Sequence, residues 1–437
     1  MPHKNIFCAT PWYEIHIYWD GGLGICCVES HRLYKDTETQ YNIANMSIME
    51  WFNTEPPKKI RRDMAGSSGI SICSQCYIEE GNGGNSRRFN SNMKSVIFTR
   101  NAFDASYSQS PGLPHFQHSI ENQGHADTHP IDLHIDLGNF CNLACKMCDP
   151  SASSTIASQE VRWGIESSKK FVGVDWTKDP VVWQRFKDEL LTIPHLNNIH
   201  FMGGETLLTD RMEDLVDHMI QHKRFDVCFS FVTNGTIFRA RLLDKLSKFR
   251  RVGIEVSIET LTKHNAYVRQ GTDTQQVLDN IKHYQNWCTG NVSLTLRPAP
   301  NILTIGNYTT LLEYALENKL VVKSVLVTRP DFMDATILPE SIKQLYLTRY
   351  QDLLSRLEHI DASSDYNASD PAQYVQIVKQ QILMITEVLK AKQPDDAEAR
   401  LKKLVQHCKR WDAVYNLNAW DLYPEFEEIL SRYGYGT

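Results

Sequence analysis

The distribution of apolar and polar positions divides the chain at about residues 130 and 330. Between these points short β-rich apolar runs alternate with stretches of helical spacing. Such a series predicts parallel strands joined by right-handed helical crossovers. We therefore expect an α/β fold, a partial (β/α)6 TIM-like barrel over 131–330, with functional loops at the carboxyl ends of its strands. The expected strands are 131–137, 196–202, 227–232, 253–258, 292–297 and 322–328, with helices near 208–222, 239–248, 273–287 and 305–318.

The flanking parts differ from this pattern. Residues 1–105 are irregular, rich in Gly, Asn and Ser, and contain a group of cysteines, so we expect a cysteine-rich auxiliary domain. Residues 106–130 are polar and without periodicity, which is typical of a linker or surface loop. Residues 331–437 contain no further strand pattern. Helical spacing predicts a C-terminal helical extension, with helices near 339–357, 371–392, 395–411 and 423–433.

Charge and hydropathy exclude several classes of protein. A net charge of −6 gives no bulk attraction for nucleic acid. No apolar run approaches the roughly 18 residues of a membrane span, and the first residues lack a secretion signal. We therefore expect a cytoplasmic protein without membrane or nucleic-acid partners. In a reducing compartment clustered cysteines are expected to bind metal or to perform chemistry, and eight of the eleven cysteines fall in two clusters. Cys228, Cys288 and Cys408 stand alone and are expected to be packed thiols.

The most specific motif is a run of three cysteines directly after the first expected barrel strand. Cys141, Cys145 and Cys148 have CxxxCxxC spacing. Thiolates are the usual ligands of a [4Fe–4S] cluster. The absence of a fourth thiolate nearby leaves one iron open to a small molecule. A structural zinc site is the alternative, but it normally takes a fourth Cys or His close by, and the neighbouring residues offer none.

This motif resembles the signature of the radical S-adenosylmethionine (AdoMet, or SAM) superfamily. Met147 stands where that family often has an aromatic residue, and its thioether is suited to packing on a purine. The resemblance implies reductive cleavage of AdoMet at the cluster to a 5′-deoxyadenosyl radical that abstracts a substrate hydrogen atom. It also implies a flavodoxin- or ferredoxin-type electron donor.

Two further motifs follow in the order that the family shows. Gly203-Gly204-Glu205 comes after the second strand and resembles the GGE motif that holds the AdoMet amino group. Two glycines let the backbone approach a ligand closely. Thr233 and Asn234 end the third strand; an Asn-Gly pair also signals a plain turn, so a turn and a ligand role both remain open.

Three later residues extend the resemblance. Ser257 matches the position from which family members contact the AdoMet ribose or carboxylate. Arg269 resembles the arginine that pairs with the carboxylate, although a surface arginine is the alternative. Arg297 and Arg329 end the fifth and sixth strands. They are expected either to bind an anionic group or to support acidic neighbours such as Glu205 and Glu259.

A second set of cysteines precedes the barrel. Cys73 and Cys76 are spaced to bind one metal from a single turn, and Cys8 with one of Cys26 and Cys27 completes four thiolates. An Asp-Gly hairpin before the adjacent pair is expected to bring the set together. The spacing resembles the auxiliary iron–sulfur (SPASM or twitch) domains of radical AdoMet enzymes and favours Cys26. In most of those enzymes this domain follows the barrel. Structural zinc is the rival interpretation.

The resemblance predicts an oxidoreductase or modifying enzyme. A four-thiolate auxiliary cluster would accept the substrate electron, which favours oxidation or cross-linking of a peptide or protein side chain. Radical modification of a small molecule, such as a sugar or nucleotide, is the alternative within the enzyme class. Outside it, a non-catalytic iron–sulfur or zinc protein is the competing hypothesis.

Overall fold

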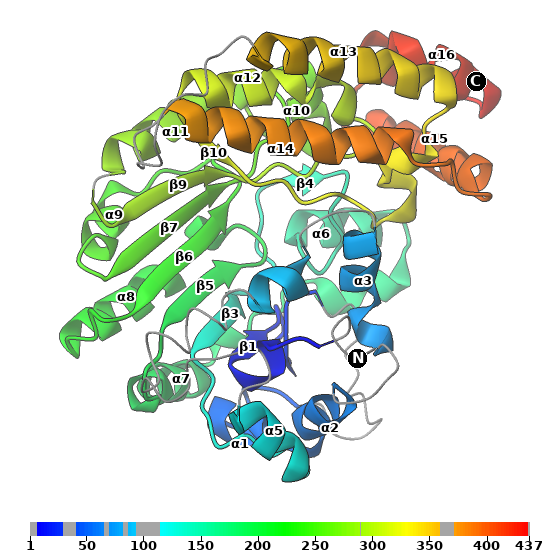
Figure 1. The fold of residues 1–437 in the computed structure, drawn as a ribbon. Helices are drawn as coiled ribbons and strands as arrows, with labels where there is room; N and C mark the ends of the chain where they lie inside the picture. The colour runs from blue at the N-terminus through cyan, green and yellow to red at the C-terminus, as the bar shows by residue number, and fades with distance from the viewer. Residues whose placement is uncertain are drawn as a thin grey trace.

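A curved eight-stranded sheet forms the centre of the fold, with strand order β10-β9-β7-β6-β5-β3-β1-β2 (Figure 1). The computed structural model describes residues 7–28, 41–64, 70–81, 86–92, 114–288, 290–358 and 371–435. The strands from β1 to β10 in this order are parallel, and only β2 pairs antiparallel. Six of them form the predicted (β/α)6 partial barrel: β3 (Asp132–Asp136), β5 (Asn198–Met202), β6 (Cys228–Thr233), β7 (Arg251–Val256), β9 (Val292–Leu296) and β10 (Val321–Val322).

Helices follow these strands, as the periodicity predicted. Side chains alternate along each strand, so that on β6 Phe229 and Phe231 are buried while Ser230 between them is half-buried on the other face. The apolar face packs under the helices and the more polar face lines the barrel interior. The barrel helices are α6 (Ser154–Arg162), α7 (Pro180–Thr192), α8 (Arg211–Gln221), α9 (Ala240–Leu246), α10 (Lys263–Val268), α11 (Thr274–Trp287) and α12 (Thr309–Glu317).

The last barrel strand is much shorter than the predicted 322–328, and two prolines explain the difference. Beyond Val322, the Val325 N–H still donates to Pro298 O at 2.9 Å and the Val327 N–H to Pro300 O at 3.3 Å. Proline has no N–H to return the bond. The segment therefore runs beside the end of β9 without a complete strand ladder.

The N-terminal segment contributes two strands to the same sheet, and the sequence did not indicate this pairing with the barrel. β1 (Glu14–Ile17) pairs in parallel with β3, and β2 (Leu23–Gly24) pairs antiparallel with β1. The turn between them contains Asp20 and Gly21, with Gly21 at φ +82°, so the predicted Asp-Gly hairpin is confirmed. The cysteine-rich segment is thus continuous with the barrel sheet.

Short helices surround this hairpin: α1 (Ile48–Phe52), α2 (Glu55–Asp63) and α3 (Ser74–Gly81). A further helix, α5 (Pro114–Glu121), lies in the stretch expected to be a linker or a surface loop, so these eight residues do not form a loop. The expected domain boundary at 105 lies outside the described residues.

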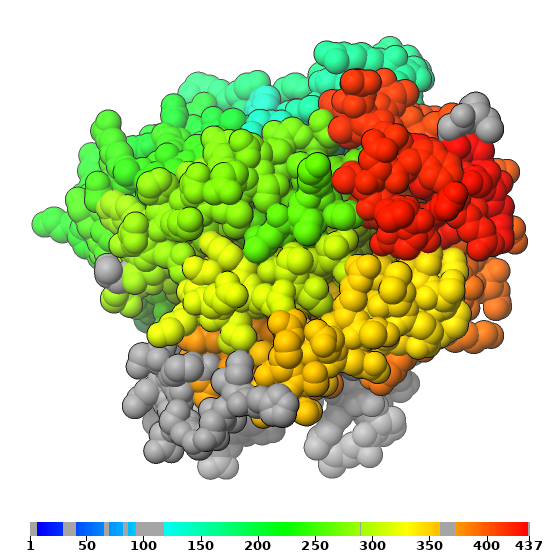
Figure 2. All heavy atoms as spheres, turned by 90° about the horizontal axis from the view of Figure 1, so that it is seen from above, coloured from blue at the N-terminus to red at the C-terminus, as the bar shows by residue number. Residues whose placement is uncertain are grey.

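The C-terminal extension is helical, as predicted. It consists of α13 (Glu340–Glu358), α14 (Pro371–Lys390), α15 (Ala397–Tyr415) and α16 (Glu427–Arg432). Seen from above, the orange and red C-terminal helices lie against the teal residues that follow the cysteine motif (Figure 2). Among the described residues, none of the helices has the length and apolar character needed to cross a membrane.

Candidate active site with two sets of cysteines

The CxxxCxxC loop is fixed in place by a short two-stranded sheet. β4 (Ala144–Cys145) pairs antiparallel with β8 (Arg269–Gln270), which places Cys145 opposite Arg269. The Lys146 N–H then donates to Val268 O at 2.8 Å. The loop follows β3 directly, at the carboxyl end of the barrel where such folds place their chemistry.

The three thiols lie close enough to change one another's acidity. A hydrogen bond from the Cys148 thiol lowers the pKa of Cys145 to about 7, and Arg269 acts in the same direction. Burial raises the pKa of Cys141 to about 12, with a further contribution from Cys145. The loop therefore favours a thiolate first at Cys145, and thiolates are the form that binds iron.

Gly203 and Gly204 let the loop after β5 approach the cysteine loop. Both have positive φ, +75° and +52°. A Cβ on Gly203 would lie 2.6 Å from Asp136 Cβ, and one on Gly204 would lie 2.2 Å from Phe140 O. Glu205 N–H also donates to Phe140 O, at 2.6 Å. The Gly-Gly pair is thus required for packing against the residues that lead into Cys141.

The Glu205 carboxylate is buried and connects the Gly-Gly-Glu motif to the Thr233-Asn234 turn at the end of β6 by hydrogen bonds. Its Oε1 accepts hydrogen bonds from Thr233 Oγ1 at 2.7 Å and Leu207 N at 3.1 Å, and its Oε2 accepts from Asn234 N at 2.6 Å. Burial raises the pKa of this carboxyl, while the hydrogen bonds lower it. A carboxylate has about four acceptor positions, so one remains for an ammonium group.

Thr233 and Asn234 do more than form a turn. The Asn234 amide donates to Asn142 Oδ1 at 2.8 Å and approaches Cys141 Sγ at 3.9 Å. Asn142 in turn donates to Thr236 Oγ1 at 3.0 Å. The end of β6 is therefore hydrogen-bonded directly to the cysteine loop.

The arginines take different partners. Arg269 is buried and donates through Nη1 to Glu259 Oε1 at 2.9 Å, and its Nε has no partner among the described residues. Arg269 is thus not the surface arginine of the alternative interpretation. Arg297 pairs with Glu255, with Nε 3.3 Å from Oε2, rather than with Glu205 or Glu259. Arg329 is exposed.

Ser257 and Met147 have lesser contacts. Ser257 lies two residues beyond Glu255 and is half-buried, and its N–H donates to Thr233 O at 2.9 Å. Met147 is half-buried against the core.

The N-terminal cysteines converge on one region. Burial raises the pKa of Cys8, and Cys76 adds to this shift electrostatically. Burial also raises the pKa of Cys26, with contributions from Cys27, Glu14 and Cys8. Cys73 ends the 3-10 helix Ser71–Cys73 and Cys76 lies in the first turn of α3, so both project from one helical segment.

Cys27 faces the barrel interior instead. Its Sγ, a Glu14 carboxylate oxygen and a His134 ring nitrogen all lie within 4.8 Å of one another. The Arg87 guanidinium occupies this place: it forms an ion pair with Glu14 and lies 2.8 Å from His134 Nε2. Because a cation is already present, the group is an ion-pair network rather than a metal site.

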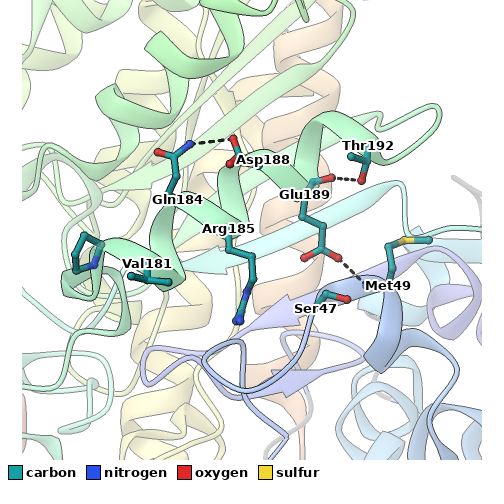
Figure 3. Close-up of a pocket in the computed structure, with 9 residues that line it drawn as sticks. Ser47, Met49, Val181, Gln184, Arg185, Asp188, Glu189 and Thr192 are labelled. Atoms are coloured by element: carbon teal, nitrogen blue, oxygen red, sulfur yellow. Dashed lines mark hydrogen bonds between the residues drawn. The ribbon is translucent and has the colours of Figure 1, made fainter.

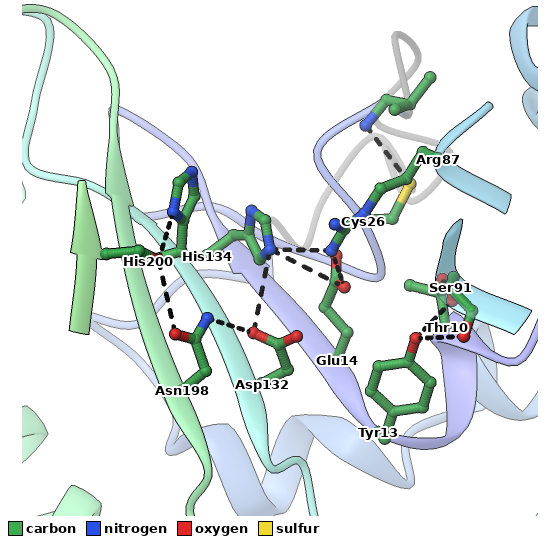
Figure 4. Close-up of polar contacts among 12 residues, drawn as sticks. Thr10, Tyr13, Glu14, Cys26, Arg87, Ser91, Asp132, His134, Asn198 and His200 are labelled. Carbon is green, nitrogen blue, oxygen red and sulfur yellow. Dashed lines mark hydrogen bonds and ion pairs between the residues drawn. The ribbon is translucent and has the colours of Figure 1, made fainter. Parts of the chain in front are cut away.

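A row of polar side chains crosses the barrel interior, and sequence reasoning missed it. His16, His134, His200 and Ser230 are register neighbours on β1, β3, β5 and β6. Polar residues at alternate positions of otherwise apolar strands were the available signal. Figure 4 shows the contacts that continue from this row to Asp132 and Arg87.

The contacts around His200 select one tautomer. Asn198 donates to Asp132 at 2.8 Å through its Nδ2, which leaves its Oδ1 to accept from Ser230 at 3.4 Å. Ser230 Oγ then accepts from His200 Nδ1–H at 2.7 Å. The Nε2 atom of His200 is therefore an unprotonated acceptor in the interior. Burial lowers the pKa of His200 to about 4, in keeping with a neutral ring.

A surface pocket of about 830 Å³ lies away from all these groups, between the start of α1 and α7 (Figure 3). Glu189 on α7 accepts from the Ile48 and Met49 N–H groups at 3.1 and 2.9 Å. It thereby satisfies free N–H groups at the start of α1. No cysteine lines this pocket. The Glu189 hydrogen bonds beside it connect the N-terminal segment to the barrel.

Comparison with known families explains both cysteine sets. The sequence model of the Radical SAM superfamily matches residues 135–289 and covers the CxxxCxxC loop and both motifs bound to it. The model of the SPASM iron–sulfur cluster-binding domain matches residues 8–77 and covers the N-terminal cysteines. The chain therefore contains a radical SAM domain over residues 135–289. A SPASM domain over residues 8–77 precedes it.

Individual relatives of this chain are distant in sequence. A radical SAM cyclopropyl synthase, TigE, of Paramaledivibacter caminithermalis is 23% identical over 172 residues, which cover 37% of this chain and 35% of TigE. Among solved structures, anSMEcpe with bound AdoMet has a TM-score of 0.39 at 17% identity, covering 52% of this chain and 61% of that one. Streptococcus suis SuiB bound to its precursor peptide SuiA has a TM-score of 0.39 at 13% identity, covering 69% and 68%. The chain thus spans about a third of the curated relative.

A radical SAM domain implies a [4Fe–4S] cluster and AdoMet, and a SPASM domain implies auxiliary iron–sulfur. The residues present fit both groups. Three thiols meet beside the buried Arg269, whose Nε has no partner among the described residues.

Proposed function

We propose that Cys141, Cys145 and Cys148 ligate the [4Fe–4S] cluster at which this protein reductively cleaves AdoMet. The observation that carries the proposal is that hydrogen bonds join the cysteine loop, the Gly-Gly-Glu motif and the end of β6. The Glu205 N–H donates to Phe140 O, and the Glu205 carboxylate accepts from the Asn234 N–H. The Asn234 side-chain amide in turn lies next to Cys141 Sγ. When bound, the cluster and AdoMet supply a 5′-deoxyadenosyl radical. The chain itself contributes the orientation of the reactants and the exclusion of water.

Around AdoMet, Glu205 retains one acceptor position for the amino group, and the glycines before it allow close approach. Arg269 Nε is buried and remains available to donate to the AdoMet carboxylate, while Arg269 Nη1 donates to Glu259 Oε1. Ser257 provides a hydroxyl near the end of β7, and Met147 an apolar contact for the purine.

Cys8, Cys26, Cys73 and Cys76 are the proposed ligands of the auxiliary cluster. Support comes from the electrostatic proximity of Cys8 to both Cys76 and Cys26. Cys27 is excluded from the set because its thiol is directed to Glu14 and His134. Four protein thiolates would leave this cluster free to accept an electron from the substrate rather than to bind it.

The proposed reaction is oxidation or cross-linking of a peptide or protein side chain, with electrons delivered by a flavodoxin- or ferredoxin-type donor. The SPASM domain supports this class, and the curated relative is named for forming a cyclopropyl group. The barrel interior carries neutral His200 and the Arg297–Glu255 pair, which suit a polar substrate group.

The test is anaerobic reconstitution followed by iron analysis and incubation with AdoMet and dithionite. We expect about eight irons per chain for two [4Fe–4S] clusters, and 5′-deoxyadenosine that disappears in Cys145→Ala. Cys288→Ala, a half-buried thiol outside both sets, is the matched control and should retain both. Failure of the reconstituted wild-type chain to bind iron and AdoMet would refute the proposal.

A further inference from the structure

Lys146 lies between two proposed cluster ligands, yet its side chain leaves the cysteine loop in the direction of the C-terminal extension. The side chain is completely buried. Its Nζ lies 4.2 Å from the centre of the Tyr267 ring, 5.5 Å from that of Trp411, and 3.6 Å from Asp412 Oδ1. Burying an ammonium group is costly unless charge and aromatic faces compensate. Trp411 and Asp412 on α15 provide much of that compensation.

Asp412 is held firmly in its position. Its Oδ2 accepts from Tyr267 Oη at 3.1 Å, from Ala419 N at 3.0 Å and from Tyr435 Oη. These contacts leave Oδ1 directed at Lys146. Among the described residues neither Lys146 Nζ nor Asp412 Oδ1 has a hydrogen-bond partner, so the two interact through charge.

Apolar packing continues this contact along α15. Trp411 forms a small buried cluster with Ala144 and Ile156, and Cys148 and Trp163 pack against it. The Trp163 ring meets Trp411 edge-on, with centroids 5.4 Å apart at 85°. The cysteine loop therefore lies between β8 on one side and α15 on the other.

From this arrangement we propose that the C-terminal extension is a working part of the cluster site. It acts through Lys146, a positioning residue. The Lys146–Asp412 pair anchors the loop. Lys146 belongs to the loop itself, between Cys145 and Cys148, whereas Asp412 lies on α15. Each electron added makes an iron–sulfur cluster more negative, so a buried positive charge favours the reduced state. The inference rests on the proposed ligation by Cys141, Cys145 and Cys148.

The charge is tested by the double variant Lys146→Met/Asp412→Asn, which removes both charges and leaves neither buried alone. In the reconstituted full chain, an EPR-monitored redox titration follows the signal that changes on addition of AdoMet. We expect the midpoint potential of that signal to become more negative with iron content unchanged. The single variant Lys146→Arg keeps the positive charge, so its midpoint potential should lie near the wild-type value. Lys402→Met, an exposed lysine on the same helix, should leave it unchanged.

An unshifted potential in the fully loaded double variant would overturn the electrostatic role. Anchoring is measured separately, by hydrogen–deuterium exchange of residues 139–150 in Asp412→Asn. Faster exchange there than in Lys402→Met is expected, and equal exchange would overturn the anchoring role. A wild-type chain without the AdoMet-sensitive signal would instead refute the proposed cluster ligation, so the two failures are distinguishable.

Discussion

Arg269 lies opposite Cys145 in the β4–β8 pair while its guanidinium donates to the buried Glu259 at 2.9 Å. One arginine therefore neutralises a buried carboxylate and favours the thiolate form of the neighbouring cysteine.

Replacing Arg269 by Met should destabilise the chain strongly, because Glu259 would remain buried without its partner. We expect a loss of about 3–5 kcal/mol in the free energy of unfolding, measured with urea on the metal-free protein. Arg269→Met/Glu259→Gln should recover most of the loss. Equal losses in the single and double variants would contradict this account. Arg329→Met, at an exposed position, is the control.

Gly204 and Gly164 both have positive φ. Their replacement by alanine should nevertheless change the stability of the chain by different amounts. Gly164 has φ +80° but open space around a new Cβ, so only backbone strain of about 1–2 kcal/mol applies. At Gly204 the Cβ would collide with Phe140 O, so we expect a loss above about 3 kcal/mol and weaker iron loading. Similar thermal midpoints for Gly204→Ala and Gly164→Ala would show that the loop adapts.

Adjacent cysteines should behave as different groups. Cys26→Ser is expected to lose the auxiliary cluster, about four irons per chain, whereas Cys27→Ser should keep it. Iron analysis and the visible absorption of anaerobically reconstituted protein distinguish the two. Loss of iron in Cys27→Ser with retention in Cys26→Ser would reverse the assignment.

His200 should make the fold sensitive to acid. Its pKa is lowered to about 4 in the folded chain, whereas the unfolded imidazole titrates near about 6.5. Between these values the unfolded chain binds more protons, so stability falls as pH decreases from about 6.5 to 4. His200→Gln should make this decline shallower, as read from urea unfolding at several pH values. An unchanged slope would contradict the buried neutral ring.

The same ring offers a spectroscopic check. In protein labelled with ¹⁵N-histidine, His200 should show a protonated Nδ1 and an unprotonated Nε2 at pH 7. Ser230→Ala removes the acceptor of the Nδ1–H bond and should shift the tautomer ratio. A protonated Nε2 in the wild-type chain would contradict the assigned hydrogen bonds.

The sequence alone determined the order of the barrel elements and the radical SAM motif, because strand and helix periodicity and CxxxCxxC spacing are local properties. It also indicated that Cys26 rather than Cys27 joins the N-terminal set, although only by spacing. Helix 273–287 illustrates the local signal: α11 spans Thr274–Trp287.

Only the tertiary structure decided what these elements contact. The pairing of β1 with β3, the ion pair of Arg269 with Glu259 and the burial of Lys146 against Asp412 join residues up to 266 positions apart in the numbering of the chain, from Lys146 to Asp412. Hydrophobic periodicity reports which face of an element is buried but not which distant element covers it. The paired prolines that shorten β10 show the same limit, since their effect depends on the neighbouring strand.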